Sequence, residues 1–371
     1  MIDFRYHLVS LISVFLALAV GIALGAGPLK ETIGDTLTGQ VSQLREEKDA
    51  LRAELDASQV AVDEHERYLT EVSGSLLDGA LAERRIGLVL LDDVPEGTVT
   101  ELADTFAQAG AQVVARVRVT ERWTAEDDQV FRSALAARLV EYLEPSVDLS
   151  ASVDEILAAA LAQALAGKDP AAPLTPSANA AILAELLGAE DGPLVEGDVD
   201  AGPVDAVVVV GPSYEPPADD AEPLTEEEQR TADGVLRAHA AIALAAQQRS
   251  EGAILVVDEH SGRDVVAYVR DSDDLAERIS TVTRFSSVSG RLSTVLGLGS
   301  RIALRVGHYG FDAGADSAAA PRTELPPVDR TPVVVPPGDD ETETGDGDDG
   351  ADDGADESAG DAGSGETEDA G

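Results

Sequence analysis

The chain has 371 residues, of which 71 are acidic and 26 are basic, and its formal net charge is −45. This balance excludes duplex nucleic acid as a partner, because phosphate binding needs clustered lysine and arginine. The chain has no cysteine, and its one methionine is the first residue. Disulfides, thiolate metal sites and cysteine nucleophiles are therefore excluded.

The first predicted element is an apolar helix at Leu8–Leu29. Its 22 residues suit the ~20 needed to cross a ~30 Å hydrocarbon core. The alternative is a cleaved signal peptide, whose apolar region is usually shorter, about 7–15 residues. We favour a retained anchor, at residues 1–30. Arg5 predicts that the short end lies in the cytoplasm and that the bulk of the chain lies outside it.

Small residues recur every four positions in this helix, at Ala17, Gly21 and Gly25. The last two form a GxxxG spacing, which lets two membrane helices approach closely. The alternative is that glycine is simply common in membrane helices. The spacing favours a helix that pairs with a second copy.

Residues 31–82 carry apolar positions that alternate four and three residues apart, a 3.5-residue repeat. This period is typical of a coiled coil, whereas a helix docked on its own domain keeps a 3.6 period. Lys48 at a core-type position favours a dimer. An intramolecular docking helix is the alternative. The predicted dimerisation residues of this segment are Val41, Leu44, Leu51, Leu55, Val62, Leu69 and Val72.

Residues 83–312 predict an α/β domain with a mostly parallel sheet, because short apolar runs alternate with helical segments. The runs are uniformly apolar, as in strands buried on both faces, and unlike the ~10-residue alternating strands of a membrane barrel. A loop is expected at Gly167–Ser177. The predicted strands are Arg85–Asp93, Gln112–Val119, Asp205–Gly211, Ala253–Glu259 and Asp264–Arg270, and the predicted helices are Thr98–Gly110, Thr124–Leu143, Val153–Ala166, Ala178–Leu187 and Thr225–Gln248.

Residues 313–371 form a Pro-rich and then acidic segment without periodicity. Residues 339–371 carry fifteen acids and no base. Such a composition cannot bury a core, so we expect a disordered tail.

No phosphate-binding glycine motif follows a predicted strand, and no catalytic motif is complete. The segment "GPSYE" at Gly211–Glu215 lacks the second glycine of a nucleophile elbow. His260, Ser261 and Asp264 are of the residue types found in catalytic triads, but closeness in sequence does not supply triad geometry. We predict that the protein is not an enzyme.

Polar residues directly follow several predicted strands. If these strands are neighbours, their carboxylates and imidazole converge at one edge of the sheet and suit a divalent cation. The alternative, which we favour, is that polar residues end strands because loops are solvated. His308, in "VGHYG", is a further weak metal candidate or a turn residue. The strand-end residues are Asp92, Asp93, Ser213, Tyr214, Asp258, Glu259 and His260.

The amino-terminal "DFRYHLVSLISVFLALAVGIALGAG", the following heptads and the late "VGHYG" (Val306–Gly310) resemble the actinobacterial copper transporter MctB family. The resemblance covers about residues 1–311. It implies a membrane-associated envelope protein that is linked to copper efflux and low intracellular copper and is proposed to form an outer-membrane pore. Copper as a ligand is implied by this resemblance alone, and the residues themselves establish no cofactor.

Two functions therefore remain open. The first is a copper transport or efflux component. The second is a dimeric envelope scaffold or adaptor, whose α/β domain binds a partner protein or an envelope polymer. At 1.5 Å per residue, a coiled coil of ~40 residues would hold that domain ~60 Å from the membrane.

Overall fold

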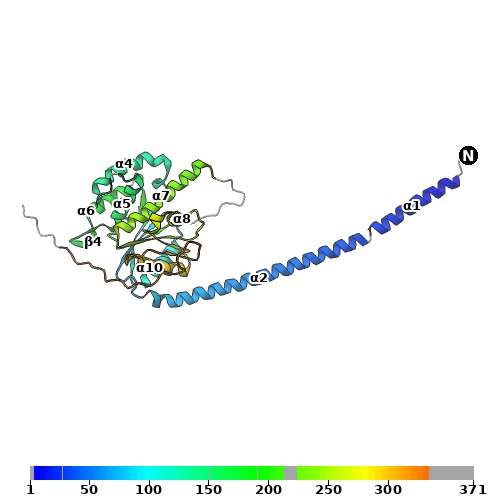
Figure 1. The fold of residues 1–371 in the computed structure, drawn as a ribbon, viewed down its shortest axis with the longest axis horizontal. Helices are drawn as coiled ribbons and strands as arrows, with labels where there is room; N and C mark the ends of the chain where they lie inside the picture. Colours follow the sequence, from blue (N-terminus) through cyan, green and yellow to red (C-terminus); the bar gives the residue numbers. More distant parts are fainter. Residues whose placement is uncertain (1–3, 27, 149, 190, 213–223, 334–371) are drawn as a thin grey trace, which may run out of the picture. The chain divides into compact units, whose positions relative to one another are not determined.

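The computed structural model describes residues 4–26, 28–148, 150–189, 191–212 and 224–333, with the backbone alone at 26, 28–36 and 38. Helices and strands alternate from β1 onward (Figure 1), which confirms the predicted α/β class. The helices are α1 Phe4–Ala26, α2 Pro28–Leu77, α3 Glu96–Gln108, α4 Gln129–Leu139, α5 Val153–Ala166, α6 Ala178–Leu187, α7 Glu226–Arg249, α8 Val265–Arg270, α9 Asp273–Ala276 and α10 Val288–Ile302, with short 3-10 turns η1 Glu121–Trp123, η2 Glu126–Asp128 and η3 Val140–Tyr142. The strands are β1 Arg85–Leu90, β2 Gln112–Val119, β3 Lys168–Asp169, β4 Ala172–Pro176, β5 Val195–Gly197, β6 Ala206–Val210, β7 Gly252–Val257, β8 Ser280–Thr283 and β9 His308–Tyr309.

Helix α1 contains the predicted membrane segment. Within the described residues it is the one helix long and apolar enough to cross a membrane, over Phe4–Gly25. Its side chains are exposed throughout that span. Helix α2 follows with 50 residues, and Pro28 occupies its first helical position, where the fixed φ of proline fits a helix start.

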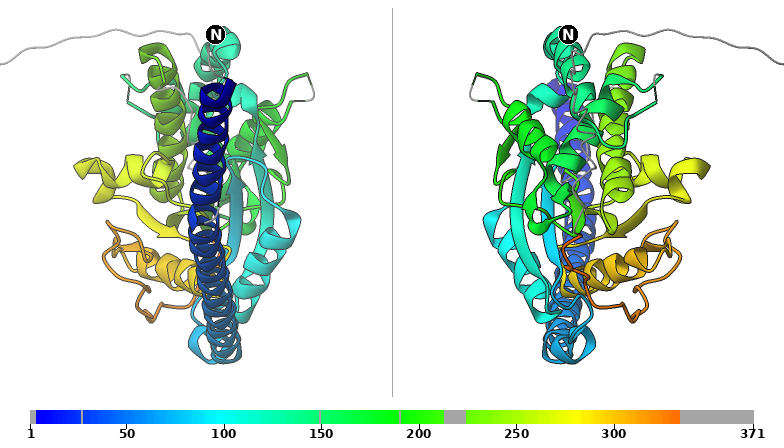
Figure 2. Two further views of the ribbon diagram at one scale, coloured as in Figure 1. Left: turned by 90° about the vertical axis from the view of Figure 1, so that its right-hand side faces the viewer. Right: turned by 90° about the vertical axis from the view of Figure 1, so that its left-hand side faces the viewer.

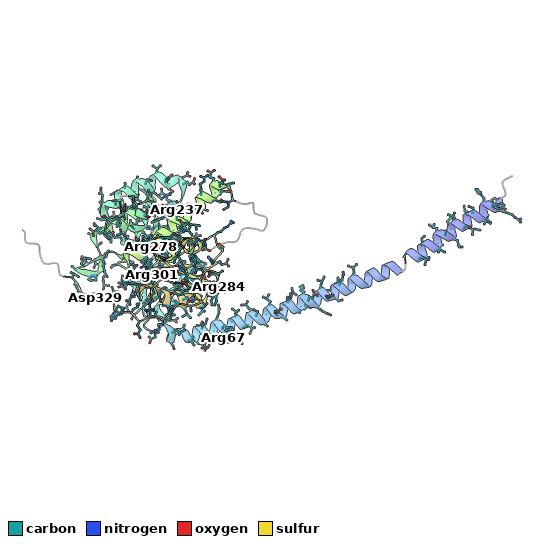
Figure 3. All side chains as sticks on the ribbon, in the orientation of Figure 1. Arg67, Arg237, Arg278, Arg284, Arg301 and Asp329 are labelled. Atoms are coloured by element: carbon teal, nitrogen blue, oxygen red, sulfur yellow. The ribbon has the colours of Figure 1, made fainter. Side chains whose placement is uncertain are left out.

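The surface of α2 changes along its length. Every side chain from residue 39 to residue 68 is exposed, as far as Arg67 in Figure 3. The last turns are buried instead: Leu77 is 0% exposed, and the Ser73 hydroxyl donates to the Gln108 side-chain oxygen of α3 at 2.8 Å. The exposed stretch, residues 39–68, is called the stalk below.

Two predicted dimerisation residues lie beyond the stalk, on the turns of α2 that approach the domain. Leu69 packs against the core that α2 shares with α3 and α10, and Val72 is half-buried. Leu69 therefore contacts the chain's own domain, and its predicted packing on a second copy stays a prediction. Val41, Leu44, Leu51, Leu55 and Val62 remain exposed.

Seven strands form one sheet in the order β5-β2-β1-β6-β7-β8-β9. Every neighbouring pair is parallel except β2 and β5. The chain places β2 on one side of β1 and β6 on the other, so the order of the strands reverses between β1 and β6. In open α/β sheets this switch point is where ligands most often bind, beyond the carboxyl ends of the strands.

The sheet is buried on both faces, which explains its uniformly apolar strands. In β6, Val207 and Val209 face a core shared with α4, α5 and α7, whereas Ala206, Val208 and Val210 face a core shared with α3, α10 and the end of α2. Figure 1 shows α5 and α7 on one side of the sheet and α10 on the other.

Capping motifs explain where helices α5 and α7 begin. The Ser152 hydroxyl accepts from the Glu155 N–H, and the Glu155 carboxylate accepts from the Ser152 N–H, which makes a capping box at the start of α5. Thr225 and Glu228 form the same motif at the start of α7. Small alanines on α5 and α7 then let these helices pack closely.

Two local predictions were wrong, and a third is confirmed as helical but is not one continuous α-helix. The predicted strand Asp264–Arg270 is helix α8, because the Asp264 carboxylate caps it by accepting from the N–H groups of Val266 and Ala267, each at 2.9 Å. The predicted loop Gly167–Ser177 contains the hairpin β3–β4. The predicted helix Thr124–Leu143 is divided into η2, α4 and η3.

The predicted tail also begins too early, because residues 313–332 (the strap) belong to the same compact unit as the domain and contact it. Ala320 is buried, and Leu325 packs on the core that contains α10. Figure 2 shows this segment, in orange, beside α10. The predicted disorder of the acidic residues 334–371 concerns a part of the chain outside the described residues.

Two arginines tie the strap to the start of the domain. Arg322 donates to the carbonyl oxygens of Leu76 and Asp78, each at 2.6 Å, and so caps the carboxyl end of α2. Arg330 binds the buried Asp205 carboxylate at 2.7 Å. The strap therefore holds in place the segment that connects the carboxyl end of α2 to strand β1.

Candidate functional site

The parallel strands β1, β6, β7 and β8 have their carboxyl ends at the same edge of the sheet, but the candidate residues there fall into two groups. Strand β6 lies between β1 and β7, so it separates the residues after β1 from those after β7. Asp92 and Asp93 line one pocket, and Asp258, Glu259 and His260 line another. Ser213 and Tyr214 lie outside the described residues.

The second pocket, called the β7–β9 pocket, has a volume of about 540 Å³. It lies where β7, β8 and β9 end, with Arg284 after β8 (Figure 3). Phe311 is 66% exposed, so an aromatic ring borders a mainly polar lining. The lining residues are Asp258, Glu259, His260, Thr283, Arg284, Ser286, Ser287, Phe311 and Asp312.

His260 is held between two carboxylates in this pocket. Its Nδ1 lies 2.9 Å from Asp264 Oδ2, and its Nε2 lies 3.7 Å from Asp312 Oδ1. The Asp264 side chain is buried and also caps α8, so its position is fixed by the helix. The imidazole orientation is thereby set by residues on two different elements.

Asp312, which follows β9, is the most connected acid of the β7–β9 pocket. Thr283 Oγ1 donates to it at 2.6 Å, and the Arg270 guanidinium forms an ion pair with it. Burial opposes ionisation of this carboxyl, but the Thr283 hydrogen bond and the Arg270 charge outweigh burial and lower the pKa of Asp312. Asp312 therefore stays a carboxylate at neutral pH.

Asp258 fixes the turn after β8. Its carboxylate accepts from the Ser286 hydroxyl and from the Ser286 N–H, and its carbonyl oxygen accepts from the Arg284 N–H at 2.9 Å. Arg284 has a φ of 59°, which is uncommon outside glycine. This contact network holds Arg284 in that backbone conformation at the rim of the pocket.

The first pocket, called the β1–β2 pocket, has a volume of about 440 Å³ and lies beside the switch point. Arg118 of β2 forms ion pairs with Asp93, at 2.8 Å, and with Glu196 of β5. The Asp92 carboxylate accepts from the Asp93 N–H at 2.7 Å. His239 of α7 reaches the same pocket from the helical layer.

His308 lies in β9 rather than in a turn. Its Nδ1 is 2.9 Å from the Thr281 hydroxyl of the neighbouring strand, and Asp316 accepts from its backbone N–H at 2.8 Å. Burial, together with the Arg270 charge, lowers the pKa of His308. The residue lines neither pocket and is part of the sheet edge.

The hydroxyl groups near His260 bond to other partners. The Ser261 hydroxyl accepts from the Arg263 N–H at 3.2 Å, and the Ser286 hydroxyl donates to Asp258, so neither hydroxyl is bonded to His260. Across the described residues, no group of three or more His, Cys, Asp or Glu side chains has the arrangement to hold a metal ion. The pockets instead offer fixed hydrogen-bonding groups to a polar ligand.

Sequence reasoning missed the residues that complete these pockets. Thr283 was missed because Ser280–Thr283 is short and partly polar, although its threonines are typical of strands. Asp312 was missed because the strand ahead of it, His308–Tyr309, has two residues. Arg270 was placed on a strand instead of a helix. His239 stands inside an alanine-rich helix, and only a fold can show that α7 carries it to the edge of the sheet.

Comparison with known proteins identifies the family. The chain matches the family described as "Copper transport outer membrane protein, MctB" over residues 1–320. It is 30% identical over 335 residues to proteins named copper transporter MctB from Mycobacterium bovis and Mycobacterium tuberculosis, covering 85% of this chain and 98% of each relative. The protein of the same name from Mycobacterium leprae is 25% identical over 342 residues, covering 87% of this chain and all of the relative. The chain therefore belongs to the MctB family.

Proposed function

We propose that this protein is a membrane-anchored envelope component that keeps intracellular copper low. The family match over residues 1–320 carries the proposal, because it includes the anchor, the stalk and the α/β domain together. The relatives that match at this length are named copper transporters. We therefore assign the copper role to the anchor, the stalk and the α/β domain acting together, and not to the α/β domain alone.

The anchor suits lipid and helix contacts better than a water-filled path. Ser13 donates to the Val9 carbonyl of the same helix at 2.8 Å, so its hydroxyl bonds within α1. At Gly21 and Gly25 an added Cβ would meet no atom within 4 Å. This open small-residue face, which includes Ala17, is available for a second α1.

Pairing of the stalk completes the proposed arrangement. Leu44, Leu51 and Leu55 are 64%, 66% and 67% exposed on one chain. A second, parallel copy would bury this stripe, and burying a leucine contributes about 1.5–3 kcal/mol. The anchors fix both chains in the same direction, which favours a parallel dimer over an antiparallel one.

The proposed orientation places the α/β domain outside the cytoplasm. Arg5 lies in the first turn of α1, at the short amino-terminal end of the chain, and basic residues near the end of a membrane helix favour the cytoplasmic side. The domain would act there by binding, without catalysing a reaction. In this arrangement the stalk sets the distance from the membrane at which the domain meets its partners.

A second candidate function is a scaffold or adaptor without transport activity. The β7–β9 pocket favours it, because an exposed aromatic residue, Phe311, adjoins fixed polar groups. Such a surface suits a partner protein or an envelope polymer. A scaffold predicts envelope partners that copurify with the full chain after crosslinking, whereas a copper component predicts a change in metal content.

The deciding experiment measures intracellular copper by elemental mass spectrometry under mild copper load. It compares a deletion strain, the same strain with the gene restored, and the parent. Raised copper that returns to the parental level on restoration supports the proposed role. Unchanged copper in the deletion strain would contradict it and favour the scaffold.

A further inference from the structure

The β1–β2 pocket contains a buried group whose partner is missing. His239 is 6% exposed, and its Nδ1 has no hydrogen-bond partner in the described part of the chain. Burying a polar group without a partner costs on the order of 1–3 kcal/mol. Such a cost is tolerated most readily where a bound species satisfies the group.

The imidazole of His239 is in the form that binds cations. Burial lowers its pKa to about 4, an effect that the nearby Asp92 charge opposes. At neutral pH the ring is therefore uncharged, with one ring nitrogen free of a proton. A neutral imidazole is a preferred ligand of late transition metals.

Two carboxylates that line this pocket, Asp92 and Glu121, form no ion pair within the described residues, and Asp92 is the one whose charge acts on His239. Asp93 and Glu196 are both engaged by Arg118. Asp92 is exposed and accepts one backbone hydrogen bond, from the Asp93 N–H. Its second oxygen has no such bond within the described residues.

The other cation of the pocket, Arg122, does not compensate Asp92. Its guanidinium binds Asp128 at 2.7 Å and lies 4.6 Å from the centre of the Phe131 ring. Imidazole and carboxylate thus share a pocket in which both arginines are already paired. The local charge balance is negative, which favours a cation.

We propose that the β1–β2 pocket binds a divalent late transition metal, Cu(II) or Zn(II), through the His239 imidazole and the Asp92 carboxylate. Two protein ligands agree with the finding that no three His, Asp or Glu side chains of the described residues form a metal cluster. Water would complete the coordination, so the ion could exchange. The choice of copper rests on the proposed function, whereas the preference for a late transition metal follows from the imidazole.

The test uses the full chain in detergent micelles, without a histidine tag. Cu(II) is added at one equivalent, and electron paramagnetic resonance reports whether a histidine nitrogen binds the metal. We expect an imidazole signal in the unchanged protein and its loss in His239→Gln. Asp92→Asn should keep the signal but weaken the affinity, measured by competition with a chelator, by about tenfold or more.

The matched control is His65→Gln, which removes an exposed imidazole from the stalk. It should leave the signal and the affinity unchanged. Mg²⁺ should not compete, because it prefers oxygen ligands. Circular dichroism checks that each variant folds, and if His239→Gln does not, Asp92→Asn at the protein surface decides the question.

Three results would overturn the site. They are oxygen-only coordination in the unchanged protein, an imidazole signal that survives in folded His239→Gln, and an unaltered affinity in Asp92→Asn. The cellular copper measurement is independent of these results. Raised copper in the deletion strain without metal binding at His239 would refute the site alone, whereas binding without a copper change would refute the proposed function alone.

Discussion

Leucine side chains are exposed in the stalk but buried at the carboxyl end of α2. Leu55, in the stalk, is 67% exposed, whereas Leu77, on the last turn, is 0% exposed. The domain buries its aliphatic residues within one chain, and the stalk displays them at a regular spacing. This difference agrees with the proposal that the stalk, unlike the domain, is covered by a second copy of the chain.

The comparison also shows why a heptad repeat alone does not identify its partner. The 3.5-residue period continues to Leu69. The apolar residues of the stalk before Leu69 are exposed to solvent, whereas Leu69 packs against the core of the same chain. Periodicity reports which face of a helix is apolar. It does not report whether a second copy or the same chain covers that face.

The substitutions with the largest expected effect prevent pairing of the stalk and leave the fold of the domain unchanged. The double substitution Leu51→Glu and Leu55→Glu places four carboxylates in the interface of a dimer. Because each leucine loses about 1.5–3 kcal/mol of burial, association should weaken by more than about 5 kcal/mol. Sedimentation equilibrium of the full chain in density-matched detergent should show monomers at micromolar concentration.

The control for this change is the pair Ala53→Glu and Ala57→Glu on the outer face of the same turns, where both alanines are exposed. It adds equal charge and should keep the dimer. Equal masses for the two double variants would refute pairing through the stripe. The domain's thermal unfolding should be the same in both.

The substitution with the next largest expected effect destabilises the domain and leaves pairing of the stalk unchanged. A Cβ at Gly290, near the start of α10, would lie 1.9 Å from the Arg284 carbonyl oxygen, so Gly290→Ala forces the backbone to move. We expect a loss of about 3 kcal/mol or more, measured by thermal unfolding. Gly234→Ala, in α7, meets no atom within 4 Å and should instead stabilise by about 0.5–1 kcal/mol.

A smaller effect tests the junction between stalk and domain. Arg322→Ala removes the two hydrogen bonds that cap the carboxyl end of α2. The domain should lose about 1 kcal/mol of stability, and amide exchange should rise in the last turn of α2. Glu324→Ala, an exposed neighbour on the strap, is the control. Unchanged exchange in Arg322→Ala would show that the strap does not hold the junction.

The smallest effect is a pH dependence confined to the domain. Because the pKa of His308 is lowered on folding, the unfolded chain takes up the proton first as the pH falls through 6.5. Its contribution therefore destabilises the domain progressively below that pH. His308→Gln should flatten the fall in stability relative to the unchanged protein, and His65→Gln on the stalk should not. Identical pH profiles for all three proteins would contradict this assignment.

The sequence predicts the α/β class and most of the helices and strands, because continuous apolar runs and capping residues such as Thr225 act locally. It does not predict how the strand ends are grouped. Asp92 and Asp258 both follow parallel strands, but their separation depends on β6 lying between those strands. Strand order is a tertiary property, and no spacing along the chain encodes it directly.

The remaining misses have a similar cause. Asp264 begins a predicted strand in the sequence but serves as a helix cap in the structure, because its carboxylate accepts from the N–H groups at the start of α8. The strap reads as a disordered segment by composition. Arg322 and Arg330 order it through distant carbonyl and carboxylate groups that composition does not reveal.

The most direct test of the central claim, that a paired stalk carries the copper role, is the intracellular copper content of a deletion strain under mild copper load. The strain carries the unchanged gene, the Leu51→Glu and Leu55→Glu variant, or the Ala53→Glu and Ala57→Glu control, each confirmed in the membrane fraction. We predict parental copper with the unchanged gene and the control, and raised copper with the stalk variant. Parental copper with all three would contradict the claim.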